Sequence, residues 1–136
     1  MASLAVMDAV DARLAANWTR CAIVADDTTG QGPADGSPYL TVEYPVAREE
    51  QITVGSPGAN VFRETGVIRL VLVQQTGTGR RQPVQWMDEL RALFRSTLFS
   101  GVTTFAPSPA IVDPANYAGG KFKVSCAVPY YFDLFA

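Results

Sequence analysis

The 136-residue chain contains no histidine. Histidine is the side chain that most often acts as a general base near neutral pH, and it is a common ligand for transition metals. Its absence excludes a conventional Ser-His-Asp triad and removes the usual basis of a zinc site. We expect no catalytic residue, no metal site and no cofactor, and a protein that is not an enzyme.

Cysteines and long apolar runs are also scarce. Cys21 and Cys126 are the two cysteines, and we expect buried free thiols, because a disulfide framework or a metal site needs more ligands at closer spacing. No apolar run approaches the roughly 18 residues that span a bilayer, and the N-terminus lacks the basic start of a signal peptide. These features predict a protein made in the cytosol with no membrane partner.

The charge balance is mild. Charged residues make up 18% of the chain, and the net charge is −2. This argues against a protein that grips nucleic acid by neutralising many phosphates, although DNA can still pass along its surface. The hydrophobic content of 48% is ordinary for a globular protein. The length predicts one domain spanning residues 1–136.

Apolar residues at spacings of three and four predict two amphipathic helices. The first is expected over residues 3–17, with Ser3 as its N-cap. The second is expected to start near Pro83, to carry its apolar stripe as far as Leu98 and to stop at Gly101.

Alternating residues predict a β-ribbon that projects from the main sheet. Strands are expected at residues 39–46 and, more weakly, at 51–54, with the charged residues 48–50 connecting them. Such a ribbon is a candidate contact for another subunit or partner. Its candidate contact residues are Tyr44, Val46, Arg48, Glu49, Glu50, Ile52 and Val54.

The segment Val67–Val73 is apolar on both faces of a predicted strand. Such a strand is normally central in its sheet, or is covered on both faces by helix or by a neighbouring subunit. Arg69 interrupts it and needs a partner, because an unpaired buried charge is costly. The terminal aromatic stretch is equally hard to bury on both faces, which adds the candidate interface residues Tyr130, Tyr131 and Phe132.

Further strands are expected at residues 21–25, 102–105 and 122–132. Near the end of the last strand, Pro129 cannot donate to a ladder, which predicts an edge or a bulge there. The resulting order of elements, α-β-β-β-β-α-β-β, predicts an α+β fold. Its mostly antiparallel (mixed) β-sheet is expected to carry two α-helices packed on one face and the projecting β-ribbon.

Two loops suggest other chemistry. Residues 77–81 combine glycines with Arg80 and Arg81, which suits a phosphate, but they lack the Lys-Ser/Thr ending of a P-loop. A nucleotide site, a solvated turn and a basic loop that touches a partner or passing DNA all stay open. The acidic loop 26–35, taken with the two arginines, leaves a small α+β ligand-binding module or enzyme as an alternative function.

Five stretches, taken in order, carry a family resemblance. They are Leu14–Trp18, Pro38–Val42, Gly66–Val73, the pair Gly77 and Gly79 leading into Trp86–Phe94, and Val128–Asp133. In this order the chain resembles the tail terminator (tail completion) proteins of long, flexible-tailed bacteriophages. This is the lambda-type group, which includes versions in phage-derived gene transfer agents.

The resemblance implies a structural assembly protein of a phage-like particle. It implies a homo-oligomer, a hexameric ring that caps the head-proximal end of the tail tube, ends tube polymerisation and joins the tail to the capsid neck. The implied partners are the tail tube protein and a head–tail connector or stopper protein. The implied location is the virion, after assembly in the host cytoplasm. A head-side connector or stopper of the same particle is the alternative within this biology.

The residues agree with this resemblance at two points. Six copies at −2 each carry −12, so DNA is expected to pass through the lumen without tight binding. Strands that are apolar on both faces also gain a purpose if neighbouring copies cover them.

Overall fold

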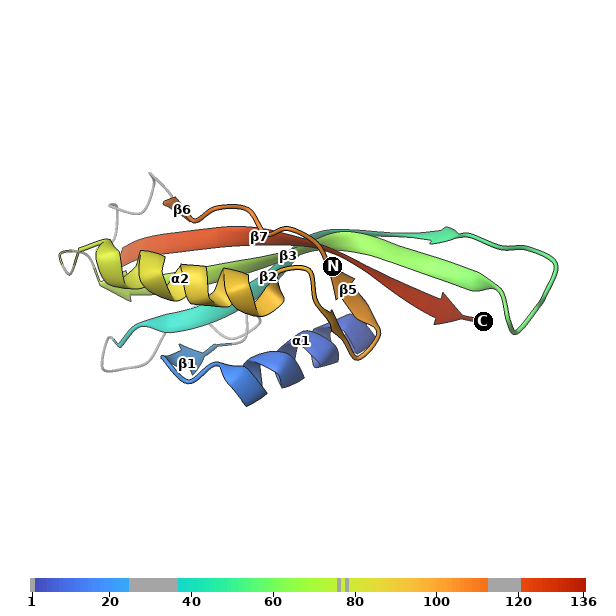
Figure 1. Ribbon diagram of the computed structural model, residues 1–136, viewed down its shortest axis with the longest axis horizontal. Coiled ribbons are helices and arrows are strands. Elements are labelled where there is room, and N and C mark those ends of the chain that lie inside the picture. The colour runs from blue at the N-terminus through green and yellow to red at the C-terminus, as the bar shows by residue number, and fades with distance from the viewer. Residues whose placement is uncertain (1, 25–36, 76, 78, 113–120) are drawn as a thin grey trace.

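The computed structural model describes residues 2–24, 37–75, 77, 79–112 and 121–136. Within these residues the helices are α1 (Leu4–Asn17) and α2 (Arg81–Phe94) (Figure 1). The strands are β1 (Ala22–Ile23), β2 (Tyr39–Gln51), β3 (Val61–Gln75), β4 (Leu98–Phe99), β5 (Val102–Thr104), β6 (Ile111–Val112) and β7 (Lys121–Phe135). Neither described helix is long and apolar enough to cross a membrane.

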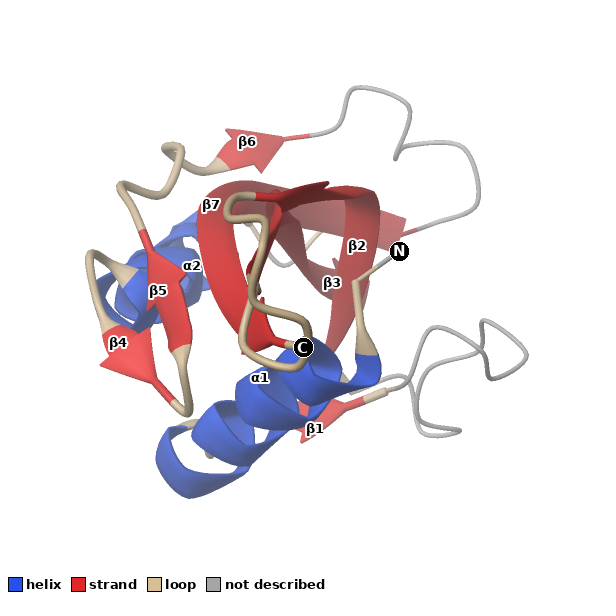
Figure 2. Cartoon of the chain, turned by 90° about the vertical axis from the view of Figure 1, so that its right-hand side faces the viewer, coloured by secondary structure: helices blue, strands red, loops and turns tan. Residues whose placement is uncertain are grey.

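Three long strands form the centre of the sheet. The strand order is β1-β2-β3-β7-β5-β4, and β6 pairs with β7. β3 lies antiparallel between β2 and β7, whereas β1 pairs with β2 in parallel. The sheet is therefore mixed and mostly antiparallel, and it is strongly curled (Figure 2). The predicted α+β fold is confirmed.

Both helices contribute to one apolar core on the same face of the sheet. The apolar stripes of α1 and α2 meet the even-numbered residues of β3 and β7, because alternate strand residues share a face. The most deeply buried members of this core include Val6, Val10, Leu14, Leu40, Ile68, Leu70, Met87, Leu90, Phe94, Val124 and Val128.

The opposite face of β3 is covered differently along its length. Val71 and Val73 are each only 3% exposed and cluster with Tyr39, so the chain itself covers this part of the strand. Arg69, on the same face, has the partner that the sequence required. Its Nη1 lies 2.5 Å from Oε2 of Glu43 on β2, and both side chains are 40% exposed.

The predicted end of the second helix is wrong. α2 ends at Phe94 rather than at Gly101. Ser96 adopts a positive φ of 47°, and the Thr104 hydroxyl on β5 donates to the Phe94 carbonyl at 2.5 Å. This contact comes from a residue ten positions away, so the helical periodicity does not reveal it. Leu98, which the periodicity assigned to the helix, lies in β4 instead.

The predicted division of the ribbon into two short strands is also wrong. β2 runs without interruption to Gln51, and the charged residues 48–50 pair with residues 65–63 of β3. The segment 51–54 forms no separate strand. The physical reason is that β3 begins at Val61, earlier than its apolar run suggested, and offers hydrogen-bonding partners to the charged residues.

Pro129 does not lie at a sheet edge. β7 has β3 on one side, where Pro129 aligns with Val67, and the continuation of β5 on the other. There the Phe105 N–H donates to the Pro129 carbonyl at 3.0 Å. A proline carbonyl accepts normally, so the sheet loses only the bond that proline cannot donate.

Arg13 ties α1 to the end of α2. Its Nε and Nη2 both donate to the Leu93 carbonyl, at 3.1 and 2.7 Å. We expect Arg13→Ala to lower the free energy of unfolding by about 2 kcal/mol, because a helix-end carbonyl loses a charged donor. The matched control is Arg20→Ala, which removes an exposed ion pair with Glu89 and should cost less than about 1 kcal/mol. Urea unfolding measures both, and equal losses contradict the assignment.

Candidate assembly interface

β2, β3 and β7 continue past both helices as a three-stranded projection (Figure 1). We call this projection the ribbon; it comprises residues 46–51, 61–67 and 129–135. It begins just after a register shift between Glu43 and Val46, which is a bulge in β2. Residues 52–60 join β2 to β3 at its far end and are called the tip loop.

A buried carboxylate fastens the base of the ribbon to the body of the protein. Glu64 is 7% exposed, and its Oε2 accepts hydrogen bonds from the Tyr130 hydroxyl at 2.6 Å and from the Ser3 N–H at 3.2 Å. Ser3 is the N-cap of α1, but its own side chain makes no capping bond. Glu64 thus supplies the negative group that the positive end of the helix favours.

Tyr130 is held as a hydrogen-bond donor at this base. Burial, followed by the hydrogen bond to Glu64, raises the pKa of the Tyr130 hydroxyl well above its ordinary value. The hydroxyl therefore stays protonated at physiological pH. Because the ring is 2% exposed, Tyr130 supports the ribbon from inside the core.

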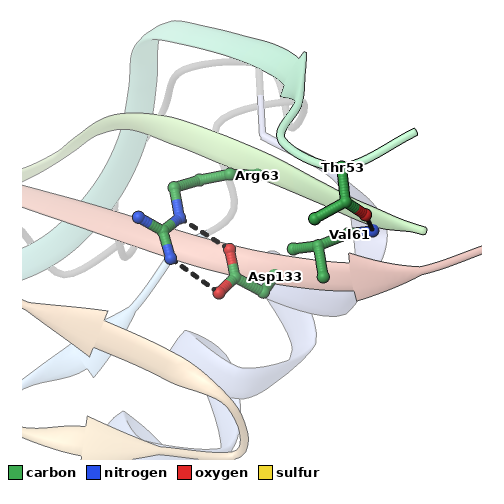
Figure 3. A network of polar contacts seen from close by, with 4 residues as sticks. All are labelled: Thr53, Val61, Arg63 and Asp133. Atoms are coloured by element: carbon green, nitrogen blue, oxygen red, sulfur yellow. Dashed lines mark hydrogen bonds and ion pairs between the residues drawn. The ribbon is translucent and has the colours of Figure 1, made fainter. Parts of the chain in front are cut away.

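Side-chain hydrogen bonds define the tip loop. The Asn60 Oδ1 accepts from the Ser56 N–H at 3.1 Å, and the Asn60 backbone pairs with Ala136 through two bonds of 2.9 Å. The Thr53 hydroxyl accepts from the Val61 N–H at 2.9 Å (Figure 3). The turn is thus joined to β3 and to the end of β7, which gives the tip a defined shape.

The arginines of the ribbon have carboxylate partners. Arg63 donates to both oxygens of Asp133, at 2.8 and 2.9 Å (Figure 3), and its guanidinium lies 4.4 Å from the centroid of the Tyr131 ring. The hydrogen bond to Arg63 holds the pKa of Asp133 below its usual range. Arg48 lies 2.5 Å from Glu50. These pairings make the ribbon a poor surface for phosphate groups.

Apolar side chains remain exposed along the ribbon, from its base to its far end, and in the tip loop. A monomer gains nothing from a projecting element that presents them to water, so they indicate a surface for another protein. They are Val46, Ile52, Val54, Leu134 and Phe135, with exposures of 58, 50, 81, 47 and 68%.

Most of the sequence-predicted contact residues lie together on this projection. Val46, Ile52 and Val54 are exposed, as are the charged residues 48–50. Tyr44 is half-buried and packs against the core just before the ribbon begins. The sequence prediction omitted Leu134 and Phe135 because it ended the last strand at residue 132, whereas β7 continues to Phe135.

The terminal aromatic residues divide between two faces. Tyr130 lies in the core, as described above, and Phe132 is half-buried against that core. Tyr131 points to the opposite face, where its ring packs 5.6 Å from that of Phe105. Of the three predicted interface residues, Tyr131 is therefore the one placed on the face away from the helices.

α2 begins near the end of the molecule opposite the ribbon (Figure 1), and Arg80 and Arg81 stand at its start. Both are exposed at the start of α2, and the Gln74 side chain ties their loop to β3 through the Gly79 carbonyl at 2.8 Å. A shallow hollow there is lined by Arg80, Arg81, Val84, Gln85 and Asp88. The acidic loop 26–35, on which the ligand-binding alternative relied, lies outside the described residues.

An α+β protein that, among the residues described, presents exposed apolar side chains on a projecting sheet has the character of an assembly subunit. The chain matches the phage tail terminator protein family over residues 5–130. It therefore belongs to that family and has a structural role in a phage tail. The family resemblance inferred from the order of elements is confirmed.

One solved structure, whose name describes no function, has the same fold along the whole chain. It is 20% identical, the match covers 100% of this chain and 98% of that one, and the TM-score is 0.63. At this identity the likeness shows the fold alone. Comparison with curated protein sequences gives no match.

Proposed function

We propose that this protein forms a hexameric ring that caps the head-proximal end of the tail tube. The ring ends tube polymerisation and joins the tail to the capsid neck. The observation that carries the proposal is the ribbon, an ordered projection with exposed apolar residues in a member of the tail terminator family. Contact with neighbouring copies and with the tube end removes these residues from water.

The proposed ring has a lumen through which DNA passes without tight binding. The net charge of −2 per copy opposes a strong grip on phosphates. Arg80 and Arg81, exposed at the end opposite the ribbon, are proposed as a loop that faces the lumen or the DNA. Two arginines in a chain of net negative charge are expected to bind DNA weakly rather than tightly.

The proposed partners are copies of the same chain, the tail tube protein and a head–tail connector or stopper protein. The proposed location is the virion, after assembly in the host cytoplasm. The family match favours the tail side over a head-side connector. The match supports neither a gene transfer agent nor a virus over the other.

Electron microscopy of tail tubes mixed with the purified protein tests this function. We expect sixfold rings at one end of each tube, and tubes that no longer lengthen when more tube protein is added. Rings on the portal of tail-less capsids instead indicate the head-side connector. Tube ends that stay bare in the presence of folded protein count against both the ring and the cap.

A further inference from the structure

An apolar band crosses the base of the ribbon on the face opposite the helices. The strand register aligns Val46, Val67 and Pro129 in one row. The hydrogen bond from the Phe105 N–H to the Pro129 carbonyl extends this row by one more strand. Arg69 and Val71 share this face of β3, because alternate residues of a strand point the same way.

A second row on the same face continues the band. Tyr131 lies two residues beyond Pro129. It aligns with Thr103 on β5, which in turn aligns with Leu98 on β4. Its ring packs against Phe105, and Leu98 is 72% exposed. We call the set the band; it consists of Val46, Val67, Leu98, Phe105, Pro129 and Tyr131.

The outer edge of β2 is guarded against strand addition, so a partner on this side of the ribbon must use a face. Pro45 offers no backbone donor, and the bulge between Glu43 and Val46 breaks the ladder. The charged residues 48–50 follow directly. Proline, bulges and charge are the features by which proteins prevent edge pairing.

The tip loop and the adjoining end of β7 hold a second apolar set, which we call the tip. The tip cannot reach the band of its own chain. Ile52, Val54 and Phe135 are exposed there. Val61 at the tip and Val67 in the band lie on the same strand, β3, and six residues of a strand span about 20 Å. Because all three ribbon strands are paired over this length, the ribbon cannot fold back, and any contact between tip and band joins two molecules.

Electrostatics permit the partner to be a second copy of this chain. Arg63 and Asp133 pair with each other between the band and the tip, and so do Arg48 and Glu50. Neither surface therefore needs a counter-charge from its partner, which suits contact between identical acidic chains and does not suit a nucleic acid.

We propose that the tip of one copy packs on the band of the next copy. This contact joins two different surfaces, and such heterologous contacts generate rings when the rotation closes. The inference rests on the proposed ring and identifies the two surfaces that build it.

Three variants of the full chain test the contact. Val54→Asp alters the tip, and Leu98→Asp alters the band. Leu4→Asp is the matched control, because Leu4 is also 72% exposed but lies on α1, outside both surfaces. Native mass spectrometry measures ring formation against concentration. We expect rings from the wild type and the control. The tip and band variants should stay monomeric up to concentrations at least about 100-fold above those at which the wild type forms rings, because the contact would bury an unpaired charge.

Mixing the tip and band variants separates this contact from other arrangements. Each variant retains the surface that the other has lost, so the mixture should give dimers with one intact contact and no rings. A mixture that stays monomeric, or rings that persist in both variants, overturns the contact and leaves the ring itself standing. If the wild type forms no ring, with or without tubes, the ring proposal fails and the contact fails with it.

A crosslinking measurement avoids any dependence on variant folding. A photoreactive amino acid in place of Val54 should join one copy to the segment 98–105 of another within wild-type-like rings. Crosslinks from this position to the tube protein alone overturn the proposal, because they assign the tip to a different partner.

Discussion

Replacing Gly66 with alanine is expected to lower the free energy of unfolding by about 2 kcal/mol. Gly66 lies in β3 at the base of the ribbon. A Cβ atom there would overlap the Val46 carbonyl oxygen, and it would lie 2.9 Å from the Tyr130 hydroxyl oxygen and 3.0 Å from a carbon of that ring. The space beside Gly66 is therefore already filled by backbone and by a buried aromatic side chain.

Two opposing effects decide the result. Glycine to alanine restricts the unfolded chain, which stabilises the folded state by about 0.4–1 kcal/mol where the site has room. Overpacking costs about 1–3 kcal/mol, and occasionally more, when neighbours cannot move. Here one neighbour is the backbone of Val46 beside the bulge, and the other is Tyr130, which Glu64 holds in place. Neither neighbour can move easily, so the destabilisation from overpacking exceeds the stabilisation from the restricted unfolded chain.

Urea unfolding of Gly66→Ala and Thr65→Ala measures the effect against a matched neighbour. Thr65 is exposed on the same strand and points to the opposite face, so its truncation should change the free energy of unfolding by less than about 1 kcal/mol. A Gly66→Ala protein as stable as the wild type shows that β2 or Tyr130 can shift, and that the base of the ribbon is less rigid than its contacts indicate.

Local patterns predicted the helical side of the fold well. The expected helix over residues 3–17 is α1, Leu4–Asn17, because its apolar periodicity is complete within the segment itself. The end of α2 was missed, since the hydroxyl of Thr104 that meets its last carbonyl comes from β5. Periodicity describes what a segment does alone, whereas this contact depends on where a later strand lies.

The length of the ribbon was underestimated for a related reason. Residues 48–50 and Arg63 are charged and are typical of a loop, yet they lie in paired strands where Arg63 meets Asp133 across β3 and β7. Cross-strand pairing of this kind stabilises charged residues in a sheet. The partner lies 70 residues away in sequence, so no local pattern reveals it.

The sequence located the projecting element, but not the face on which each of its residues lies. The sequence identified the ribbon as the projecting element, and the structure places Val46 and Val54 on its exposed surface. The sequence did not reveal that Tyr130 faces the core. Nor did it reveal that Leu98 and Phe105 lie on the same face of the sheet as Val46. A bulge changes which residues of a strand share a face, and a shift of one residue turns every side chain over.

Raising the pH from about 9 to 11 is expected to remove about 2 kcal/mol of stability through Cys126 alone. Burial raises the pKa of the Cys126 thiol from 9.0 to about 11, and the side chain is 1% exposed. A folded-state pKa above the unfolded value means that the unfolded chain loses its proton first. The stabilisation is therefore complete below pH 9 and is lost as the pH rises to 11.

Tyr130 extends the loss to higher pH for the same reason. Burial and the hydrogen bond to Glu64 raise the pKa of its hydroxyl above the ordinary 10.0, so its contribution begins to fall above pH 10. Urea unfolding at pH 8, 9, 10 and 11 should show a steepening decline. Cys126→Ala is expected to flatten the decline between pH 9 and 10, and Tyr130→Phe to reduce it above pH 10, whatever each costs at pH 8. A decline that neither substitution alters shows that other groups unfold the protein in alkali, and that the buried base of the ribbon is open to water.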